Sequence, residues 1–168
     1  DQGVHNINLV TGTHCVPAIC AALEPQPPVP VVWNSGGYEC VETLKRLEGL
    51  VDVYMPDFKF LDSDLSARLA SAPDYPAVAK KAIMEMYRQV GDPVFDDEGV
   101  MTRGLLIRHL VLPGHAEDSM RILDWLADHL PIETWVSLMA QYVPCGRALE
   151  MADLNRTLAE EEYDAVQE

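Results

Sequence analysis

The sequence predicts an α/β protein in which strands and helices alternate around a parallel sheet. Five short apolar runs have the length of buried strands, and stretches with an apolar period near 3.6 residues lie between them. Alternation of this kind is typical of β/α units, because a crossover helix joins neighbouring parallel strands. Polar residues follow each of the five runs. In such a fold that pattern supports a binding site, since ligands of β/α proteins bind at the carboxyl ends of the strands.

The five predicted strands are short segments typical of buried strands. The run VDVYM shows the pattern most clearly, because Val51, Val53 and Met55 alternate with other residue types. The predicted ranges are HNINLV (5–10), PVVWN (30–34), VDVYM (51–55), LLIRHLVL (105–112) and TWVSLMA (134–140).

Four amphipathic stretches predict the helices between these strands. Pro17 suits the first turn of the first helix, and Gly91 and Pro131 follow the third and fourth, as is typical of helix ends. The stripes of Met and Leu on these helices are expected to be core. The predicted ranges are 16–24, 39–48, 76–90 and 116–130.

Three further segments interrupt or follow the alternation. Residues 61–75 form a polar insertion with a short helix predicted near 63–70, and residues 92–103 carry the turn residues of a hairpin or flap. Residues 151–168 are expected to form one helix. With no repeats and no low-complexity linker, residues 1–168 are predicted to form a single domain.

Charge and hydropathy argue against two classes of partner. Twelve basic and 27 acidic side chains give a net charge of −15, whereas non-specific binding to nucleic acid or anionic membranes needs clustered Lys and Arg. No apolar run approaches the roughly 20 residues of a membrane span. We therefore expect neither a nucleic-acid nor a membrane partner.

The four cysteines are scattered and form no Cys-x2-Cys clip. Free thiols in a reducing, cytoplasmic protein are the expected state, and a metal site built from these cysteines alone is not expected.

Asp57 and Lys59 follow the third strand at a spacing of two, which places both side chains on one face. A carboxylate beside an ammonium at a strand end suits a small zwitterion, although a salt bridge that closes a loop fits the same pattern. Arg108 lies within an apolar strand and must find a partner, because an unpaired buried charge is very costly. Asp57 is the predicted partner.

Every other strand also ends in polar residues, which favours a binding site over packing alone. These residues are Thr11 to His14, Asn34 to Tyr38, His109 with His115, and Gln141 with Tyr142.

Four long segments, in this order, resemble the radical S-adenosylmethionine proteins related to pyruvate formate-lyase activating enzyme. They are NINLVTGTH, VVWNSGGYECVETLKRLEGLVDVYMPDFKF, YPAVAKKAIMEMYRQVG and RGLLIRHLVLPGH. The resemblance covers residues 3 to about 163, and it is greatest for an uncharacterised branch of activating-enzyme homologues.

The resemblance implies a partial (β/α)6, TIM-like barrel. Members of this family hold a [4Fe-4S] cluster by Cys-x3-Cys-x2-Cys and cleave S-adenosylmethionine to a 5′-deoxyadenosyl radical, which in activases takes hydrogen from a glycyl-radical enzyme. This chain has no such cysteine motif and begins without Met. We therefore expect a C-terminal portion of about five β/α units that lacks the first unit, is inactive alone and carries neither cofactor as a resident group.

Cofactor-binding positions of the family fall on several residues of this chain. The Gly-Gly-Glu turn falls on Gly12 to His14, so that His14 replaces the glutamate, and the Asp-Thr-Asn-Gly turn begins at Asn34 and Ser35.

The other family positions lie later in the chain. The Asp-x-Lys pair falls on Asp57 and Lys59, the strand arginine falls on Arg108, and the histidine near the last strand falls around Gln141 or Tyr142. The protein partner implied is a glycyl-radical enzyme or another protein substrate.

Two other functions remain open at this stage. Lys59 near Arg108 could act as a Schiff-base nucleophile in an aldolase-like barrel, although Asp57 favours its charged form. A non-catalytic binding module with the same fold is the second alternative, which the substitution at His14 favours. A dimer of this chain could be an artefact of truncation, because exposed edge strands pair readily.

Overall fold

The computed structural model describes residues 3–168 and shows a mixed α/β fold built on one six-stranded, mostly parallel sheet. The strand order is β1-β2-β3-β5-β4, with β6 also paired to β5, and the sheet does not close on itself. Only the β4–β5 pair is antiparallel among these strands. The strands are β1 (Ile7–Val10), β2 (Val31–Ser35), β3 (Val53–Pro56), β4 (Val94–Phe95), β5 (Met101–Leu110) and β6 (Trp135–Met139).

The five predicted strands are confirmed, with shifts at their ends. The first begins at Ile7 rather than at residue 5, and the fourth begins at Met101 because the hairpin extends it. The helices are α1 (Val16–Ala22), α2 (Val41–Lys45), α3 (Ser63–Ala70), α4 (Tyr75–Val90), α5 (Ala116–His129) and α6 (Glu160–Gln167), with short 3-10 helices at Gly12–Cys15 and Gly146–Glu150.

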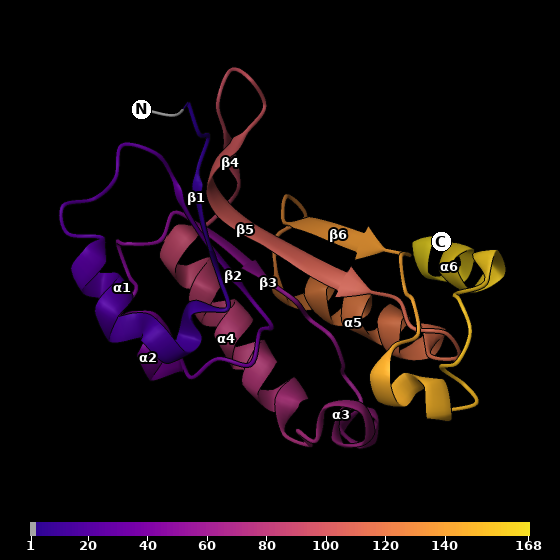
Figure 1. The fold of residues 1–168 in the computed structure, drawn as a ribbon. Helices are drawn as coiled ribbons and strands as arrows, with labels where there is room; N and C mark the ends of the chain where they lie inside the picture. Colours follow the sequence, from indigo (N-terminus) through magenta and orange to yellow (C-terminus); the bar gives the residue numbers. More distant parts are fainter. Residues whose placement is uncertain (1–2) are drawn as a thin grey trace.

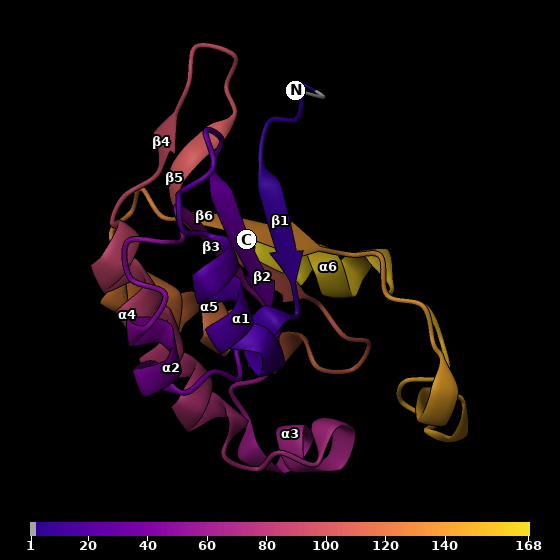
Figure 2. The same cartoon turned by 60° about the vertical axis from the view of Figure 1, so that its left-hand side comes forward.

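Helices α4 and α5 pack along one face of the sheet, as Figures 1 and 2 show. The core between them contains fully buried Trp33, Tyr54, Phe58 and Ile107. Because side chains alternate along a strand, the residues between these positions face the other way. Asn34 and Arg108 are therefore on the face of the sheet opposite α4 and α5.

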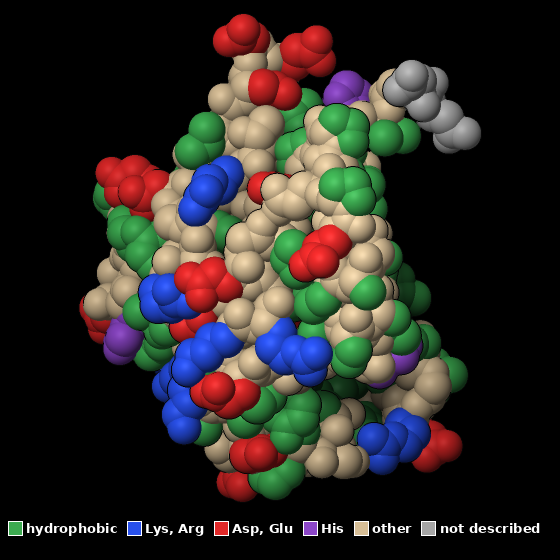
Figure 3. All heavy atoms as spheres, turned by 90° about the vertical axis from the view of Figure 1, so that its left-hand side faces the viewer, with side chains coloured by type: hydrophobic (Ala, Val, Ile, Leu, Met, Phe, Trp, Pro, Cys, Tyr) green, Lys and Arg blue, Asp and Glu red, His purple; other side chains and the backbone are tan. Residues whose placement is uncertain are grey.

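The predicted hairpin and the short predicted helix are both confirmed. Strand β4 pairs antiparallel with the start of β5, and exposed acidic side chains at residues 96–98 gather at the tip, seen at the top of Figure 3. Helix α3 begins after Asp62, whose carboxylate accepts hydrogen bonds from the backbone N–H groups of Asp64 and Leu65.

The prediction of one helix over residues 151–168 is wrong. Leu154 is buried, and its carbonyl accepts a hydrogen bond from the Tyr142 hydroxyl, which holds this stretch as a turn. Helix α6 begins only at Glu160, and Glu162 accepts a hydrogen bond from the N–H of Ala159. Tertiary contacts thus override the local helix propensity of the segment.

Within residues 3–168, no helix has the length and apolar character needed to cross a membrane.

Candidate functional site

Four side chains from three adjacent strands meet at the carboxyl ends of those strands, and we name them the strand-mouth cluster: Asn34, Asp57, Lys59 and Arg108. Asn34 belongs to β2, Asp57 directly follows β3, and Arg108 belongs to β5. Asp57 and Arg108 also form an isolated parallel bridge beyond the regular β3–β5 ladder. The predicted pairing of Arg108 with Asp57 is confirmed.

Arg108 is the centre of the cluster. Its Nε donates to Asp57 Oδ1 at 2.8 Å, and its Nη2 donates to Asn34 Oδ1 at 2.8 Å. Lys59 Nζ lies 2.6 Å from the other carboxylate oxygen, Oδ2, of Asp57. Both oxygens of this carboxylate are therefore engaged, each by a different cation.

Exposure and charge define what the cluster can bind. The Arg108 side chain is 26% exposed and that of Asp57 18%, whereas Lys59 is 47% exposed. Two cations and one carboxylate give a local charge of +1 on a chain whose net charge is −15. The cluster is thus a partly desolvated, cationic spot with one accessible ammonium, which suits a carboxylate or a zwitterion.

The loop after β2 is held against Asp57 by backbone contacts. The backbone N–H of Asp57 donates to the carbonyl of Ser35 at 2.9 Å, and the N–H of Gly37 donates to Ser35 Oγ at 3.3 Å. Gly37 has a φ of +76°, and a Cβ at this position would overlap the carbonyl oxygen of Asp57. Only glycine permits this close approach.

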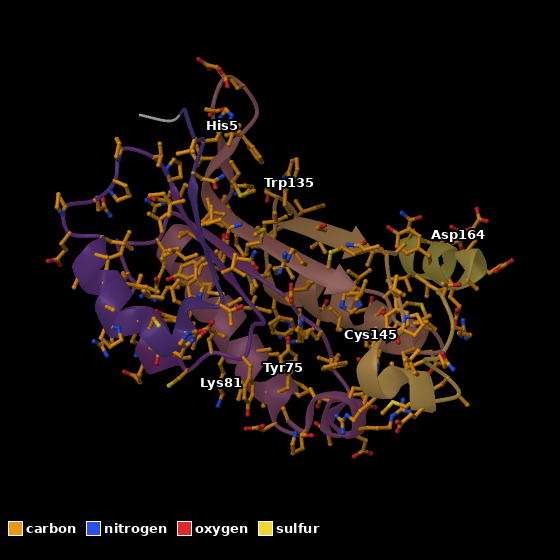
Figure 4. The ribbon with its side chains drawn as sticks, in the orientation of Figure 1. His5, Tyr75, Lys81, Trp135, Cys145 and Asp164 are labelled. Atoms are coloured by element: carbon orange, nitrogen blue, oxygen red, sulfur yellow. The ribbon has the colours of Figure 1, made fainter. Side chains whose placement is uncertain are left out.

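Tyr75, at the start of α4, fixes the segment that carries Lys59 (Figure 4). Its hydroxyl oxygen accepts a hydrogen bond from the Lys59 N–H at 2.9 Å and lies 2.8 Å from the Asp57 carbonyl and 3.0 Å from the Gly36 carbonyl. Burial raises the pKa of Tyr75, so the phenol keeps the proton that it shares between these carbonyls.

Glu39 links the loops that follow β1 and β2. One carboxylate oxygen, Oε1, accepts hydrogen bonds from Thr13 Oγ1 at 2.9 Å and from Trp33 Nε1 at 3.1 Å. The side chain is almost fully buried, and Oε2 has no hydrogen-bond partner among the described residues. Glu39 therefore connects the segment after β1 to strand β2 through buried hydrogen bonds.

The sequence interpretation missed both Tyr75 and Glu39. Tyr75 lies at the start of an amphipathic helix, and Glu39 fell inside the predicted helix 39–48, so neither carried a local signal of a role at the strand ends.

Three of the seven predicted cofactor-binding residues lie outside the cluster. His14 is exposed in the 3-10 helix after β1, and Gln141 is exposed after β6. Within residues 3–168, no hydrogen bond or ion pair joins either side chain to the cluster. Ser35 is buried and serves the backbone of Gly37.

His109, next to Arg108, lies on the other face of β5 and contacts the segment between Asp57 and Lys59. Its Nδ1 lies 2.6 Å from the carbonyl oxygen of Phe58 and its Nε2 lies 2.8 Å from Ser119 Oγ. Because a carbonyl only accepts, Nδ1 carries the proton and Nε2 accepts from the serine. Burial lowers the pKa of His109, which favours this neutral form.

A metal ion needs a group of ligands, namely clustered His, Cys, Asp or Glu side chains. The four cysteines are free, and no group of three or more His, Cys, Asp or Glu in residues 3–168 is placed to hold a metal ion. Residues 3–168 therefore hold a polar side-chain cluster but no grouping of the Cys ligands that an iron–sulfur cluster needs.

Comparison with known proteins gives one informative similarity. The chain is 36% identical over 137 residues to the uncharacterized protein MJ0674 of Methanocaldococcus jannaschii, an alignment that covers 81% of the chain and 36% of that protein. The chain thus spans about a third of the length of the curated relative it matches. No family model matches the chain, and no solved structure matches it significantly.

Proposed function

We propose that this chain is the S-adenosylmethionine-binding portion of a radical enzyme related to pyruvate formate-lyase activating enzyme. The observation that carries the proposal is Arg108, which joins Asn34 and Asp57 across three parallel strands at their carboxyl ends. The motif resemblance predicts cofactor contacts at these same residues. In this proposal the open sheet is the greater part of a partial (β/α)6 barrel, and the protein is cytoplasmic.

The cluster has the groups that a methionine zwitterion requires. Lys59 has an exposed ammonium for the ligand carboxylate, and Asp57 is the acceptor for the ligand ammonium. Arg108 donates to the Asp57 carboxylate and also donates to Asn34, so the orientation of the carboxylate is fixed before the ligand arrives. Bound S-adenosylmethionine is the source of the adenosyl radical in this family.

The residues of this chain do not fit the iron–sulfur cluster, as the scattered cysteines show. We therefore assign no step through that cluster to this chain. Its ligands would come from the rest of a longer protein, for which a glycyl-radical enzyme or another protein substrate is the proposed partner.

The Schiff-base alternative has less support from the geometry. Lys59 forms an ion pair of 2.6 Å with Asp57, which favours the ammonium over the free amine that attacks a carbonyl. Borohydride reduction in the presence of a carbonyl substrate, followed by mass spectrometry of the Lys59 peptide, tests that alternative directly.

Calorimetric titration of the chain with S-adenosylmethionine tests the proposed ligand. We expect weak but saturable binding that is lost in Asp57→Asn and Lys59→Met and retained in Lys81→Met, a control on the exposed side of α4. Equal affinity in all four proteins would contradict the proposed site.

Reconstitution of the full-length gene product with iron and sulfide tests the proposed enzyme class. We expect absorbance at about 400 nm from a Cys-ligated cluster and formation of 5′-deoxyadenosine on reduction. A full-length protein that never develops this absorbance would show that the radical-enzyme proposal is wrong.

A further inference from the structure

A mostly apolar cavity of about 280 Å³ is lined by Phe60, the residue that follows Lys59 of the strand-mouth cluster. Its walls are formed by Phe60, Leu112, Met151 and Leu154, which come from the segments after β3 and β5 and from the turn before α6. The volume lies just below the range for ligand pockets, which is about 300–1,000 Å³. The cavity is therefore sized for a small molecule or for one side chain with its neighbours.

The cavity is connected to the cluster through the chain and through a shared wall. Phe60 directly follows Lys59, and Leu112 lines both this cavity and a narrow cleft that Lys59 also lines. A ligand in the cavity would thus be separated by Leu112 from the cleft that Lys59 lines, and Lys59 is one of the groups that we propose bind the cofactor.

One unpaired cation lies at the rim. Arg68, Arg121 and Arg156, at the same end of the molecule, each form an ion pair with a carboxylate. Arg147, by contrast, lines the cavity and is exposed. Within residues 3–168 its side chain makes no hydrogen bond and no ion pair.

The hydroxyl of Tyr142, which also lines the cavity, already donates a hydrogen bond within the protein. The Tyr142 hydroxyl donates to the carbonyl of Leu154 at 2.9 Å, so its ring forms wall rather than a binding group. Apart from the thiol of Cys145, the Arg147 guanidinium is the polar side-chain group that remains for a ligand among these lining residues.

We propose that this cavity binds a small molecule with an apolar body and a carboxylate that pairs with Arg147, a ligand distinct from the protein partner of the proposed function. A single guanidinium matches a carboxylate in a two-bond fork, while the four apolar walls take the hydrocarbon part. The placement of this ligand near a cofactor site rests on the proposed function, but the chemistry of the ligand does not.

Protection of Cys145 from N-ethylmaleimide provides the test, because this exposed thiol lines the cavity. Figure 4 labels the position of Cys145. The probe is hexanoate, with 1-hexanol, hexylamine and hexyl phosphate as comparisons, and labelling is measured peptide by peptide. The exposed thiols of Cys15 and Cys40, outside the cavity, are internal controls in the same sample. We expect saturating hexanoate to slow labelling of Cys145 at least threefold without changing either control.

Two variants and a matched control sharpen the result. Arg147→Gln should raise the half-protecting hexanoate concentration about tenfold, the effect of losing a charge-assisted hydrogen bond. Ala148→Phe should fill the cavity and abolish protection by all four probes. Arg46→Gln, an exposed arginine after α2, should leave protection unchanged.

The outcomes separate this inference from the proposed function. Unprotected Cys145, or equal protection by 1-hexanol, would overturn the carboxylate site, and stronger protection by hexyl phosphate would replace the carboxylate with a phosphate. Hexanoate protection in a chain that fails to bind S-adenosylmethionine would support the cavity and contradict the proposed function.

Discussion

Two arginine-centred networks at the same end of the molecule differ in how deeply they are built into the fold. The strand-mouth cluster joins β2, β3 and β5 through Arg108. A second network, which we name the C-terminal network, consists of Arg68, His115 and Asp153 and joins α3 to the segments before α5 and α6. Both contain an arginine paired to an aspartate at 2.7 Å.

Exposure separates the two networks. Arg108 and Asp57 are 26% and 18% exposed, whereas Arg68 and Asp153 are 42% and 35% exposed. An ion pair in water contributes little, but one that is partly desolvated leaves a costly unpaired charge when it is broken. Breaking the ion pair of the strand-mouth cluster should therefore cost more stability than breaking the exposed ion pair of the C-terminal network.

Gly37→Ala should have the largest effect, because it disrupts the backbone beneath Asp57. The added Cβ would overlap the Asp57 carbonyl oxygen, and the φ of +76° disfavours any residue with a Cβ. We expect a loss of about 3 kcal/mol or more in the free energy of unfolding, measured in urea. Gly49→Ala is the matched control: its φ is +79° with no atom within 4 Å of the added Cβ, so about 1 kcal/mol is expected there. Equal losses in the two variants would contradict the steric explanation.

Arg108→Met should have the second-largest effect on the free energy of unfolding. Removal of the guanidinium leaves Asp57 with Lys59 alone and frees the Asn34 amide, so a loss of about 2 kcal/mol is expected, reduced from the fully buried case because the pair is partly exposed. Binding of S-adenosylmethionine should weaken at least tenfold by calorimetry. Arg68→Met is the control in the other network, and unchanged cofactor affinity in Arg108→Met would contradict the proposed site.

The pH dependence of stability should identify His109. Burial lowers its pKa in the folded chain, whereas in the unfolded chain the value is near 6.5. The unfolded chain therefore binds the proton more strongly, so this stabilisation is complete above about pH 6.5 and is lost as the pH falls toward the folded pKa. We expect the melting temperature to fall between pH 7 and pH 5, and to fall less in His109→Gln. His14→Gln, at an exposed position, should keep the full pH dependence.

The sheet and the central ion pair could be predicted from the sequence because their signals are local. Alternation in VDVYM identifies the two faces of β3, and the spacing of Asp57 and Lys59 predicts their contact. A charge in an apolar strand needs a partner, and that requirement alone was enough to pair Arg108 with Asp57.

The remaining features depend on contacts between distant segments, which spacing does not reveal. Tyr75 reaches the strand ends only because α4 packs across the sheet, and Glu39 meets Thr13 from a position 26 residues away. The turn at Leu154 depends on Tyr142, so helix propensity alone predicted one helix where the chain has a turn and a shorter helix.

Asp153→Asn should have the smallest effect and is the sharpest test of the difference between the two networks. Hydrogen bonds from Arg68 and His115 lower the pKa of Asp153, so its stabilisation is present near neutral pH and is lost only in acid. Because the pair is exposed, we expect a loss of less than about 1 kcal/mol in the free energy of unfolding and unchanged affinity for S-adenosylmethionine. A double-mutant cycle with Arg68→Gln measures the coupling of the pair directly. A coupling energy above about 2 kcal/mol would contradict the assignment of this pair to the surface, because exposed ion pairs contribute about 1 kcal/mol or less. A loss of cofactor affinity in Asp153→Asn would show that the C-terminal network belongs to the proposed site.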